Sequence, residues 1–266
     1  MTSIELESLR PVIRDYARQM KLPTVGREYE ALAKRARGEG MDPVAYLHAV
    51  LDAEYQDRQE RRTTRRVKEA RFPQVKTLSS FDFKRNPALD EAQIRALANC
   101  EFVREGRPVL FIGGTGTGKT HLSTALGYEA CSRGHAVKFV TAAALVNELT
   151  EARESRDLSR VVGRYARTEL LVLDELGYLP LSPEAAQLLF QVVAERGERR
   201  ATIITTNLPF SEWTSVIADP RLCRAFVERV TYRAHIVDSG EESVRLDEML
   251  KLASKTREDK GGVAKN

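Results

Sequence analysis

A glycine-rich segment near the middle of the chain has the residue types and spacing needed to hold a phosphate chain. Residues 113–120 read GGTGTGKT, and they follow an apolar run at 108–112 and precede a helix-forming run that begins at 121. Glycines let the backbone bend closely around a di- or triphosphate, and amide groups at the helix start point at its oxygens. A glycine-rich turn without a ligand is the alternative, but the strand–loop–helix order favours a nucleotide site. The expected contacts are Gly113, Gly114, Thr115, Gly116, Thr117, Gly118, Lys119, Thr120 and His121.

Two acids at the end of a later apolar run indicate that the nucleotide is hydrolysed. Within the loop, Lys119 is expected to reach the β- and γ-phosphates and the Thr120 hydroxyl to bind Mg²⁺. Residues 170–175 read LLVLDE, which is typical of a buried parallel strand that ends at the ligand-binding rim of a sheet. Asp174 is expected to hold Mg²⁺ through water, and Glu175 to polarise the attacking water. An ordinary strand with a polar end is the alternative, and the upstream phosphate loop favours ATP hydrolysis over it.

A third strand supplies a candidate sensor of the γ-phosphate. Residues 201–207 read ATIITTN, so a polar side chain follows an apolar strand. Asn207 is the first choice for this role, and Thr206 is the second. On spacing alone, Asn207 could equally begin the turn at 208–209.

The elements around these motifs alternate as in a doubly wound domain. Residues 137–141 and 234–237 are strand-like, whereas 142–153 and the segment that opens at Pro183 favour helices. Five parallel strands with intervening helices between about residues 108 and 240 predict a three-layer α/β domain. Its crossovers should be right-handed.

The first seventy residues have a different, helical character. Residues 28–37 and 43–71 favour helices, which are separated by a Gly-Glu-Gly break, and Asp42 followed by proline is typical of a helix start. Val44, Leu47 and Leu51 share one helix face. A small helical module is expected to bury that face.

The end of the second helix carries a stripe of cations that could neutralise DNA phosphates. The alternative is a solvated helix with supporting pairs such as Glu54–Arg58 and Asp57–Arg61, which lie four residues apart. The candidate DNA-binding residues are Arg58, Arg61, Arg62, Arg65, Arg66, Lys68 and Arg71.

Composition is compatible with a reduced, non-membrane setting. The 266 residues include 42 Lys+Arg and 38 Asp+Glu, and a net charge of only +4 says little about partners. The 3 cysteines are scattered, which favours free thiols over a disulfide framework, and the 4 histidines lack metal-ligand spacing. No secretory signal or membrane-spanning apolar run is visible, so a cytoplasmic protein is expected.

Three motifs together resemble a known family. The series GGTGTGKTHL, LVLDELGYLP and IITTNLPFSEW is similar to the IstB-type helper ATPases of bacterial insertion sequences. These are AAA+ proteins that resemble the DnaC helicase loader and, more distantly, the DnaA initiator. The resemblance extends from about residue 22 to 246. It implies a P-loop AAA+ fold in which a helical module (1–71) precedes an ATPase domain (72–250) and a charged tail (251–266), without a large helical lid.

The same resemblance implies a function. An IstB-type protein is expected to bind ATP and Mg²⁺, to assemble into an oligomer on double-stranded DNA, and to recruit or activate a separate, IstA-type transposase. The resemblance also favours contact of the basic stripe with DNA or with the transposase. A DnaC-like loader of a replicative helicase shares the ATPase core and is the alternative. A P-loop small-molecule kinase is the alternative from a different class, and the sensor-like strand and downstream arginines disfavour it.

The similarity to DnaA further implies an arginine that completes the ATP site of a neighbouring subunit. Residues 226–233 lie between the third and last strands, where such a residue is expected. Arg229 and Arg233 are four apart, so they are expected to share one helix face. The alternative is that they cap the carboxyl end of that helix.

Overall fold

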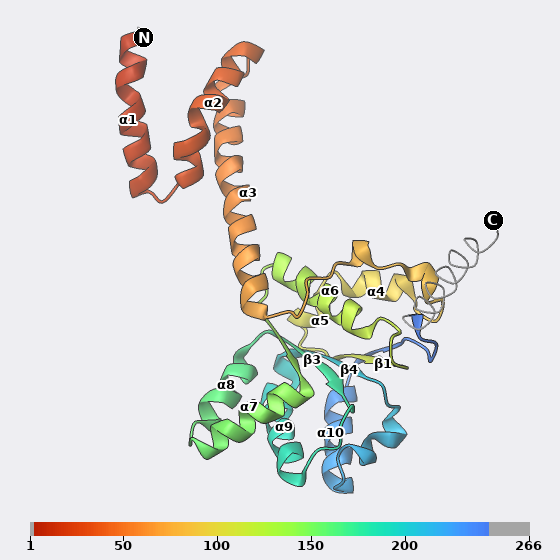
Figure 1. Ribbon diagram of the computed structural model, residues 1–266. Helices are drawn as coiled ribbons and strands as arrows, with labels where there is room; N and C mark the ends of the chain where they lie inside the picture. Colours follow the sequence, from red (N-terminus) through yellow and green to blue (C-terminus); the bar gives the residue numbers. More distant parts are fainter. Residues whose placement is uncertain (1–2, 245–266) are drawn as a thin grey trace, which may run out of the picture. The chain divides into compact units, whose positions relative to one another are not determined.

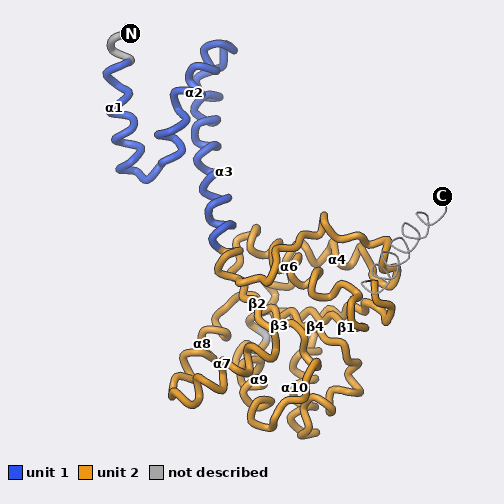
Figure 2. The backbone as a smooth tube through the Cα atoms, viewed as in Figure 1, with its two compact units in different colours: residues 1–65 blue, residues 66–266 orange. Residues whose placement is uncertain are grey.

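The computed structural model describes residues 3–244, and the chain divides into two compact units. Unit 1 comprises residues 1–65 and unit 2 residues 66–266 (Figure 2). The charged tail predicted at 251–266 lies outside the described residues.

Unit 1 is built from helices. Helix α1 (Ser3–Gln19) was not expected from the sequence, whereas α2 (Pro23–Glu39) and α3 (Pro43–Ala70) confirm the two predicted helices (Figure 1). Helices α1 and α2 pack closely, because a Cβ added at Gly26 would lie 3.3 Å from the Ala17 Cβ. Helix α3 begins as predicted, with the Val44 amide donating to the Asp42 carboxylate, and it continues past the end of unit 1.

The predicted buried face of α3 is wrong. Val44, Leu47 and Leu51 are 75%, 55% and 51% exposed. The buried positions of α3 within unit 1 are instead Val50 and Glu54, at 6% and 4% exposure. Helical spacing brings these two residues onto a common face, and that face meets α2. The pattern of α3 alone does not show which of its faces a neighbouring helix covers.

Unit 2 contains a five-stranded, fully parallel sheet, as predicted, with the order β2-β3-β4-β1-β5. In this order, the strand that precedes the phosphate loop lies next to the strand predicted at 201–207. It does not lie next to the strand that ends in the two acids. The strands are β1 (Val109–Ile112), β2 (Val137–Thr141), β3 (Leu170–Leu176), β4 (Ala201–Thr206) and β5 (His235–Asp238).

Helices cover both faces of this sheet and complete three layers (Figure 1). Two hydrophobic clusters form the core, one on each face, because alternate residues of each strand point to opposite sides. The first face is covered by α4 (Glu91–Leu97), α5 (Glu101–Arg104) and α6 (Lys119–Ser132), and the second by α7 (Ala142–Glu154), α8 (Leu158–Arg167), α9 (Pro183–Arg196) and α10 (Pro220–Thr231).

Short 3-10 turns complete unit 2, at Leu78–Ser80, Phe83–Arg85, Gly197–Arg199 and Phe210–Ser215. Cys100, Cys131 and Cys223 are free and buried. In residues 3–244, no helix is long and apolar enough to cross a membrane. Nor does this part of the chain gather three or more His, Cys, Asp or Glu side chains in a way that could hold a metal ion.

Candidate nucleotide-binding site

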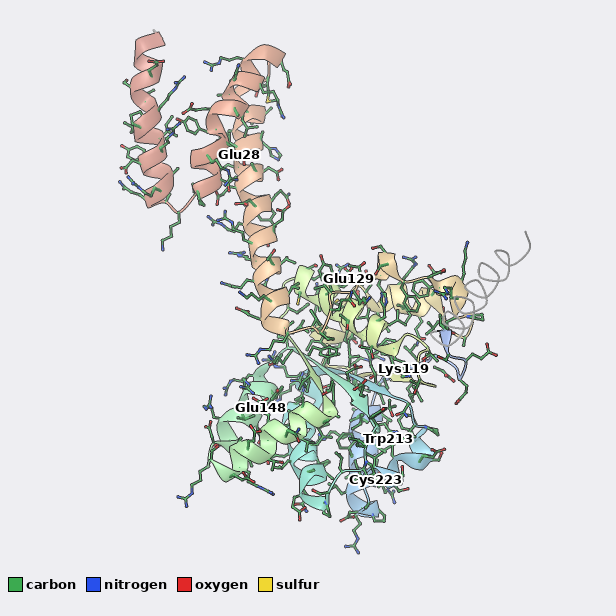
Figure 3. All side chains as sticks on the ribbon, in the orientation of Figure 1. Glu28, Lys119, Glu129, Glu148, Trp213 and Cys223 are labelled. Carbon is green, nitrogen blue, oxygen red and sulfur yellow. The ribbon has the colours of Figure 1, made fainter. Side chains whose placement is uncertain are left out.

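A cavity of about 780 Å³ opens at the carboxyl end of the sheet. The phosphate loop forms its floor, and the ends of β3 and β4 form one side. Lys119 is the first residue of α6 and follows the loop after β1, an inner strand of the sheet (Figure 3). The remaining wall comes from residues 73–86, which precede the first strand of the domain.

The first two glycines of the loop pack against the segment that follows β5, and their phosphate contact stays a prediction. The Gly114 amide donates to the Gly240 carbonyl at 2.7 Å, so the loop lies against the segment that follows β5. A Cβ added at Gly113 would lie 2.4 Å from Ser239 Oγ, which real contacts do not allow. Gly118 has φ +102°, a conformation that only glycine adopts easily, and α6 begins directly after it.

The Lys119 ammonium is directed into the loop. Its Nζ donates to the carbonyl oxygens of Gly113 and Gly114, at 2.7 and 2.6 Å. Burial lowers the pKa of Lys119, and the nearby Asp174 and Glu241 carboxylates oppose that shift. An anionic phosphate chain is a better partner for a partly desolvated ammonium than two neutral carbonyls, so the loop is prepared for phosphate.

The two residues predicted to hold the metal lie together. Thr120 Oγ1 donates to the Asp174 carboxylate, at 3.1 and 3.2 Å from its two oxygens. Asp174 is only 2% exposed, and burial raises its pKa against the hydrogen bonds from Thr205 and Thr120 and the charge of Lys119. A buried carboxylate beside a hydroxyl is an all-oxygen donor set, which suits Mg²⁺.

A bulge in β3 presents Glu175 to the cavity. Neighbouring side chains on a regular strand point to opposite faces, but the β3–β4 register shifts between Leu173 and Leu176. Glu175 has φ +59°, in the left-handed region that is uncommon for a residue with a side chain. Its exposed carboxylate lines the cavity, while Asp174 bonds Thr120. Both acids therefore lie at the same candidate site.

Thr205, which was not among the residues predicted from the sequence, holds this arrangement. Its Oγ1 donates to Asp174 Oδ1 at 2.6 Å and accepts the Glu175 amide at 2.9 Å. Thr206 instead accepts the Leu208 amide at 3.1 Å, as expected for the start of a turn. Asn207 is half-buried and lines the cavity, so its sensor role stays a prediction. Strand order was the missing signal, because only adjacency of β3 and β4 places a β4 hydroxyl beside Asp174.

Aromatic residues of the preceding segment cover the loop. A Cβ added at Gly118 would lie 2.7 Å from the Phe81 ring, so that ring rests directly on the loop. The predicted contact residue His121 packs edge-on against Phe81, with ring centroids 5.0 Å apart, and its Nε2 lies 3.1 Å from the Thr77 carbonyl. The Asn86 amide donates to the carbonyls of Thr117 and Ser239 and ties the segment to the loop.

Arg229 and Arg233 lie away from this cavity. Both line a second cavity, of about 310 Å³, which also includes Arg107 and Pro108. Pro108 directly precedes β1, and Arg233 precedes β5, so this cavity lies at the amino end of the parallel sheet, opposite the phosphate loop. The two arginines therefore do not reach the nucleotide cavity of their own chain.

The prediction that the two arginines share one helix face is wrong. Helix α10 ends at Thr231, so Arg229 lies in its last turn, whereas Arg233 follows the helix with φ +53°. The Arg233 carbonyl accepts a hydrogen bond from Arg107 Nε at 2.9 Å, which anchors the chain as it turns toward β5. Arg229 stands where a cation favours the helix dipole, as the alternative interpretation expected.

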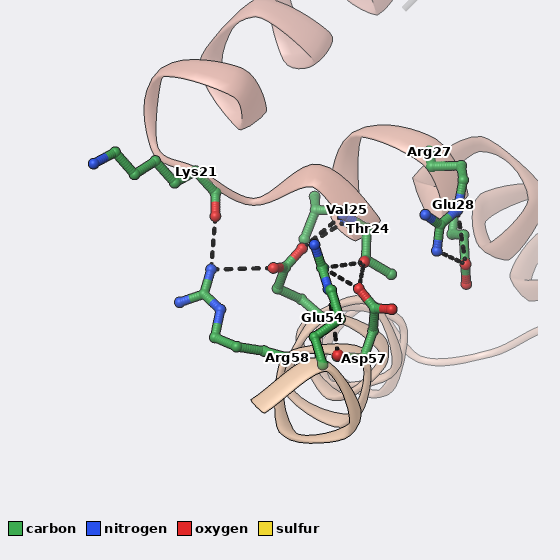
Figure 4. A network of polar contacts seen from close by, with 9 residues as sticks. Lys21, Thr24, Val25, Arg27, Glu28, Glu54, Asp57 and Arg58 are labelled. Atoms are coloured by element: carbon green, nitrogen blue, oxygen red, sulfur yellow. Dashed lines mark hydrogen bonds and ion pairs between the residues drawn. The ribbon is translucent and has the colours of Figure 1, made fainter. Parts of the chain in front are cut away.

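Two arginines of the basic stripe form hydrogen bonds and ion pairs within unit 1 (Figure 4). Arg58 donates to the Lys21 carbonyl at 2.6 Å and pairs with Glu54 at 3.1 Å. Arg61 pairs with Asp57 and also donates to Thr24 Oγ1. The pairs expected for a solvated helix are therefore present. Of the other stripe residues, Arg62, Arg65, Lys68 and Arg71 are exposed and Arg66 is half-buried.

Fold and site together define a P-loop nucleotide-binding protein of the AAA+ class. The structure of the DnaC helicase loader matches with a TM-score of 0.52 and 21% sequence identity, covering 63% of this chain and 98% of that one. DnaA bound to AMPPCP and single-stranded DNA matches with a TM-score of 0.51 and 20% identity, covering 63% of this chain and 51% of that one. At these identities the likeness establishes the fold, as the motifs predicted.

The chain belongs to the family described as IstB-like ATP binding protein, which matches residues 15–252. An ATP-binding protein of insertion sequence IS5376 from Geobacillus stearothermophilus is 35% identical over 89% of this chain and 94% of its own length. The corresponding protein of insertion sequence IS21 from Pseudomonas aeruginosa is 33% identical over 90% of each chain. The family predicted from the motifs is thereby confirmed.

Proposed function

We propose that this protein is a Mg²⁺-dependent ATPase that assembles on double-stranded DNA and recruits or activates a separate transposase. The observation that carries the proposal is the joint placement of Thr120, Asp174 and Glu175 around one cavity beside the phosphate loop. The relatives named above are ATP-binding proteins of insertion sequences, which favours transposition over helicase loading.

In this proposal each residue of the cavity has a separate task. Lys119 and the loop amides hold the phosphates, and Thr120 and Asp174 hold Mg²⁺, which neutralises charge on the phosphate oxygens when bound. Glu175 orients water for attack and accepts its proton. Asn207 contacts the γ-phosphate or that water from the end of β4.

The ATP site is completed between subunits. Arg229 lies at the opposite end of the sheet from the phosphate loop of its own chain, so a cation at that position serves a neighbour in a head-to-tail assembly. An arginine supplied in this way raises phosphoryl-transfer rates by roughly 10³–10⁵. Arg233 takes part less directly, because its backbone is turned away from α10.

DNA contact is assigned to the outward part of the basic stripe. Arg62, Arg65, Lys68 and Arg71 are exposed on or just after α3, and exposed cations at helical spacing neutralise phosphates without reading sequence. Arg58 and Arg61 support the fold of unit 1 and contribute to DNA binding only secondarily. A DnaC-like helicase loader remains the alternative for the partner.

Two variants test the ATP site. Lys119→Ala should abolish tight ATP binding, because it removes the charge-assisted phosphate contact, whereas Glu175→Gln should keep binding and slow turnover. Lys138→Ala, a half-buried lysine on β2, is the matched control and should leave both unchanged. Turnover by Glu175→Gln equal to the wild type would exclude Glu175 from the reaction.

Mixed subunits test the shared site. Arg229→Ala should bind ATP as a monomer but lose hydrolysis or ATP-dependent assembly on DNA. Mixing it with Glu175→Gln should restore part of the activity, because some interfaces then combine an intact arginine with an intact Glu175. Specific activity that does not depend on protein concentration, without rescue on mixing, would contradict a shared site.

The partner is tested by reconstitution. The protein should stimulate DNA strand transfer by the transposase encoded beside its gene, in an ATP-dependent manner. Stimulation of helicase loading in its place would establish the alternative.

A further inference from the structure

Two large hydrophobic side chains are exposed three and four residues after Glu175. Tyr178 and Leu179 are 69% and 59% exposed. They form the end of a short loop, here called the tip, which Gly177 begins with φ +102° and Pro180 ends. A single exposed leucine needs no explanation, but an adjacent pair beside an active site marks a contact surface.

The tip is held in place by the site itself. The Tyr178 amide donates to the Glu175 carbonyl at 3.4 Å, so the loop turns back toward the bulge. A Cβ added at Gly177 would lie 3.1 Å from Leu208 Cδ1 and 3.2 Å from Thr206 Oγ1. The tip therefore packs against the end of β4. Its Tyr178 lines the nucleotide cavity of its own chain, and both of its large side chains remain mostly exposed.

The opposite end of the sheet carries a cavity of matching character. Its volume is about 310 Å³, and its apolar lining includes Pro108, Phe190 and Ala225. Arg229 and Arg233 stand at its polar side. A cavity with apolar walls beside cations suits an apolar side chain that lies next to a carboxylate or a phosphate chain.

Charge favours an anionic neighbour at this cavity. Its acids already have partners, because Glu105 pairs with Arg107 at 3.3 Å and Glu228 with Arg224 at 2.8 Å. Within residues 3–244, neither the Arg229 nor the Arg233 guanidinium forms an ion pair. The edge of the cavity is therefore cationic, whereas the tip follows the acidic pair Asp174–Glu175 in the chain.

We infer that the Tyr178–Leu179 tip of one subunit inserts into the 310 Å³ cavity of a second copy of this chain and thereby brings the second copy's Arg229 to the first copy's Glu175. The inference rests on the proposed shared ATP site and names the surface that forms it. The tip lies at the carboxyl end of the sheet and the cavity at the amino end, so the contact is head-to-tail and extends from subunit to subunit.

Spacing along the chain is compatible with this contact. Ala225 and Arg229 are one turn apart on α10, which corresponds to about 6 Å along the axis. On the other subunit, Glu175 is separated from Tyr178 by a single turn closed by the hydrogen bond described above. When Leu179 lies against Ala225, the arginine and the glutamate are each one turn away from the contact.

Cysteine pairing tests the contact directly on the full-length protein with ATP and duplex DNA. Leu179→Cys subunits mixed with Ala225→Cys subunits should form a disulfide-linked dimer under a mild oxidant, and neither variant should do so alone. The native thiols interfere little, because burial raises the pKa of Cys100 to about 11 and of Cys131 to about 12. Glu154→Cys on the exposed side of α7 replaces Leu179→Cys as the control and should not link.

The same samples separate failure of this inference from failure of the proposed function. ATP-dependent assembly seen by sedimentation without the cross-link, or with equal linking in the control, would overturn the tip contact alone. Absence of any ATP-dependent assembly would overturn both. Cross-linking that requires ATP supports both.

Mixing of blocking variants gives a second readout. Leu179→Glu places a charge on the tip, and Ala225→Trp fills the cavity. Each variant should therefore raise the protein concentration needed for half-maximal assembly by about tenfold or more. Leu179→Met and Ala225→Ser are the matched controls and should assemble like the wild type. Because only one kind of interface is intact in the mixture, the two blocking variants together should stop at two-subunit complexes. Normal assembly by Ala225→Trp would overturn the inference.

Discussion

Units 1 and 2 use their buried polar groups for different purposes. In unit 2, where Leu170, Leu171, Val172 and Leu173 of β3 are fully buried, Thr205 donates to the buried Asp174 at the candidate nucleotide site. In unit 1 the buried carboxylate of Glu54 instead accepts the Thr24 and Val25 amides and caps α2. Many large apolar residues of unit 1 stay outside, namely Leu9, Val12 and Tyr16 on α1, Met20 just after it, and Val44, Leu47, Leu51 and Tyr55 on α3.

The difference shows how burial frees polar side chains for chemistry. A sheet buried on both faces stabilises unit 2 through apolar contacts, so its strand ends can carry acids and hydroxyls. Unit 1 buries little apolar surface and depends on capping and ion pairs between its helices. We expect substitutions of polar residues to cost activity in unit 2 and stability in unit 1.

One residue of unit 2 should break that rule and give the largest effect. Arg196 is fully buried and donates to Thr202 Oγ1 at 3.0 Å and to the Thr168 carbonyl at 2.9 Å, as well as to the carbonyls of Tyr165, Glu169 and Ala201. Arg196→Ala leaves these acceptors unsatisfied and should lower the free energy of unfolding by about 3 kcal/mol or more. Denaturant unfolding measures this loss, and the exposed Arg199→Ala should show none of it.

Thr205→Val tests the rule within the site. It removes the hydrogen bond that Thr205 donates to Asp174 and the one that it accepts from the Glu175 amide, and both acids belong to the proposed catalytic site. Loss of a hydrogen bond to a charged group, about 1.5–3 kcal/mol, corresponds to a decrease in kcat of about 10- to 100-fold. Steady-state kinetics should show this in kcat more than in KM, and Thr205→Ser should restore turnover. A loss of ATP binding equal to the loss of kcat would contradict a positioning role.

Glu54→Gln tests the rule in unit 1. The neutral amide is a weaker cap for the amino end of α2 and no longer pairs with Arg58, so unit 1 should lose about 1 kcal/mol of stability. Hydrogen exchange of the α2 amides should accelerate, while ATP binding by unit 2 stays unchanged. Glu60→Gln, an exposed acid on the same helix, is the control. Equal protection of α2 in both variants would show that the cap is dispensable.

The smallest effect concerns the salt dependence of DNA binding. Replacing Arg62 and Lys68 with glutamine should lower the slope of log affinity against log salt by about 2, since each phosphate contact contributes roughly 0.9. Arg58→Gln should alter the slope little, because Arg58 is occupied by Glu54 and the Lys21 carbonyl. Equal slopes for all variants would show that these residues of α3 do not contact DNA phosphates.

Local pattern was sufficient for much of the protein. The five strands lie within about a residue or two of their predicted positions, because apolar runs of strand length bounded by turns have few other stable conformations. The phosphate loop and the Asp174–Glu175 pair were predictable because glycine spacing and adjacent acids act over a few residues. The Glu54–Arg58 and Asp57–Arg61 pairs follow from the helix repeat alone.

The sequence by itself therefore determined the family, the strands, the phosphate-loop motif and the acidic pair of the candidate site, whereas tertiary structure decided which groups support them. Thr205 acts because β3 and β4 are neighbours, and Phe81 because its segment returns over the loop. The choice of the buried face of α3 and the end of α10 before Arg233 likewise depend on what packs against each helix. Such contacts join residues far apart in the chain, so their energies leave no periodic signal in the sequence.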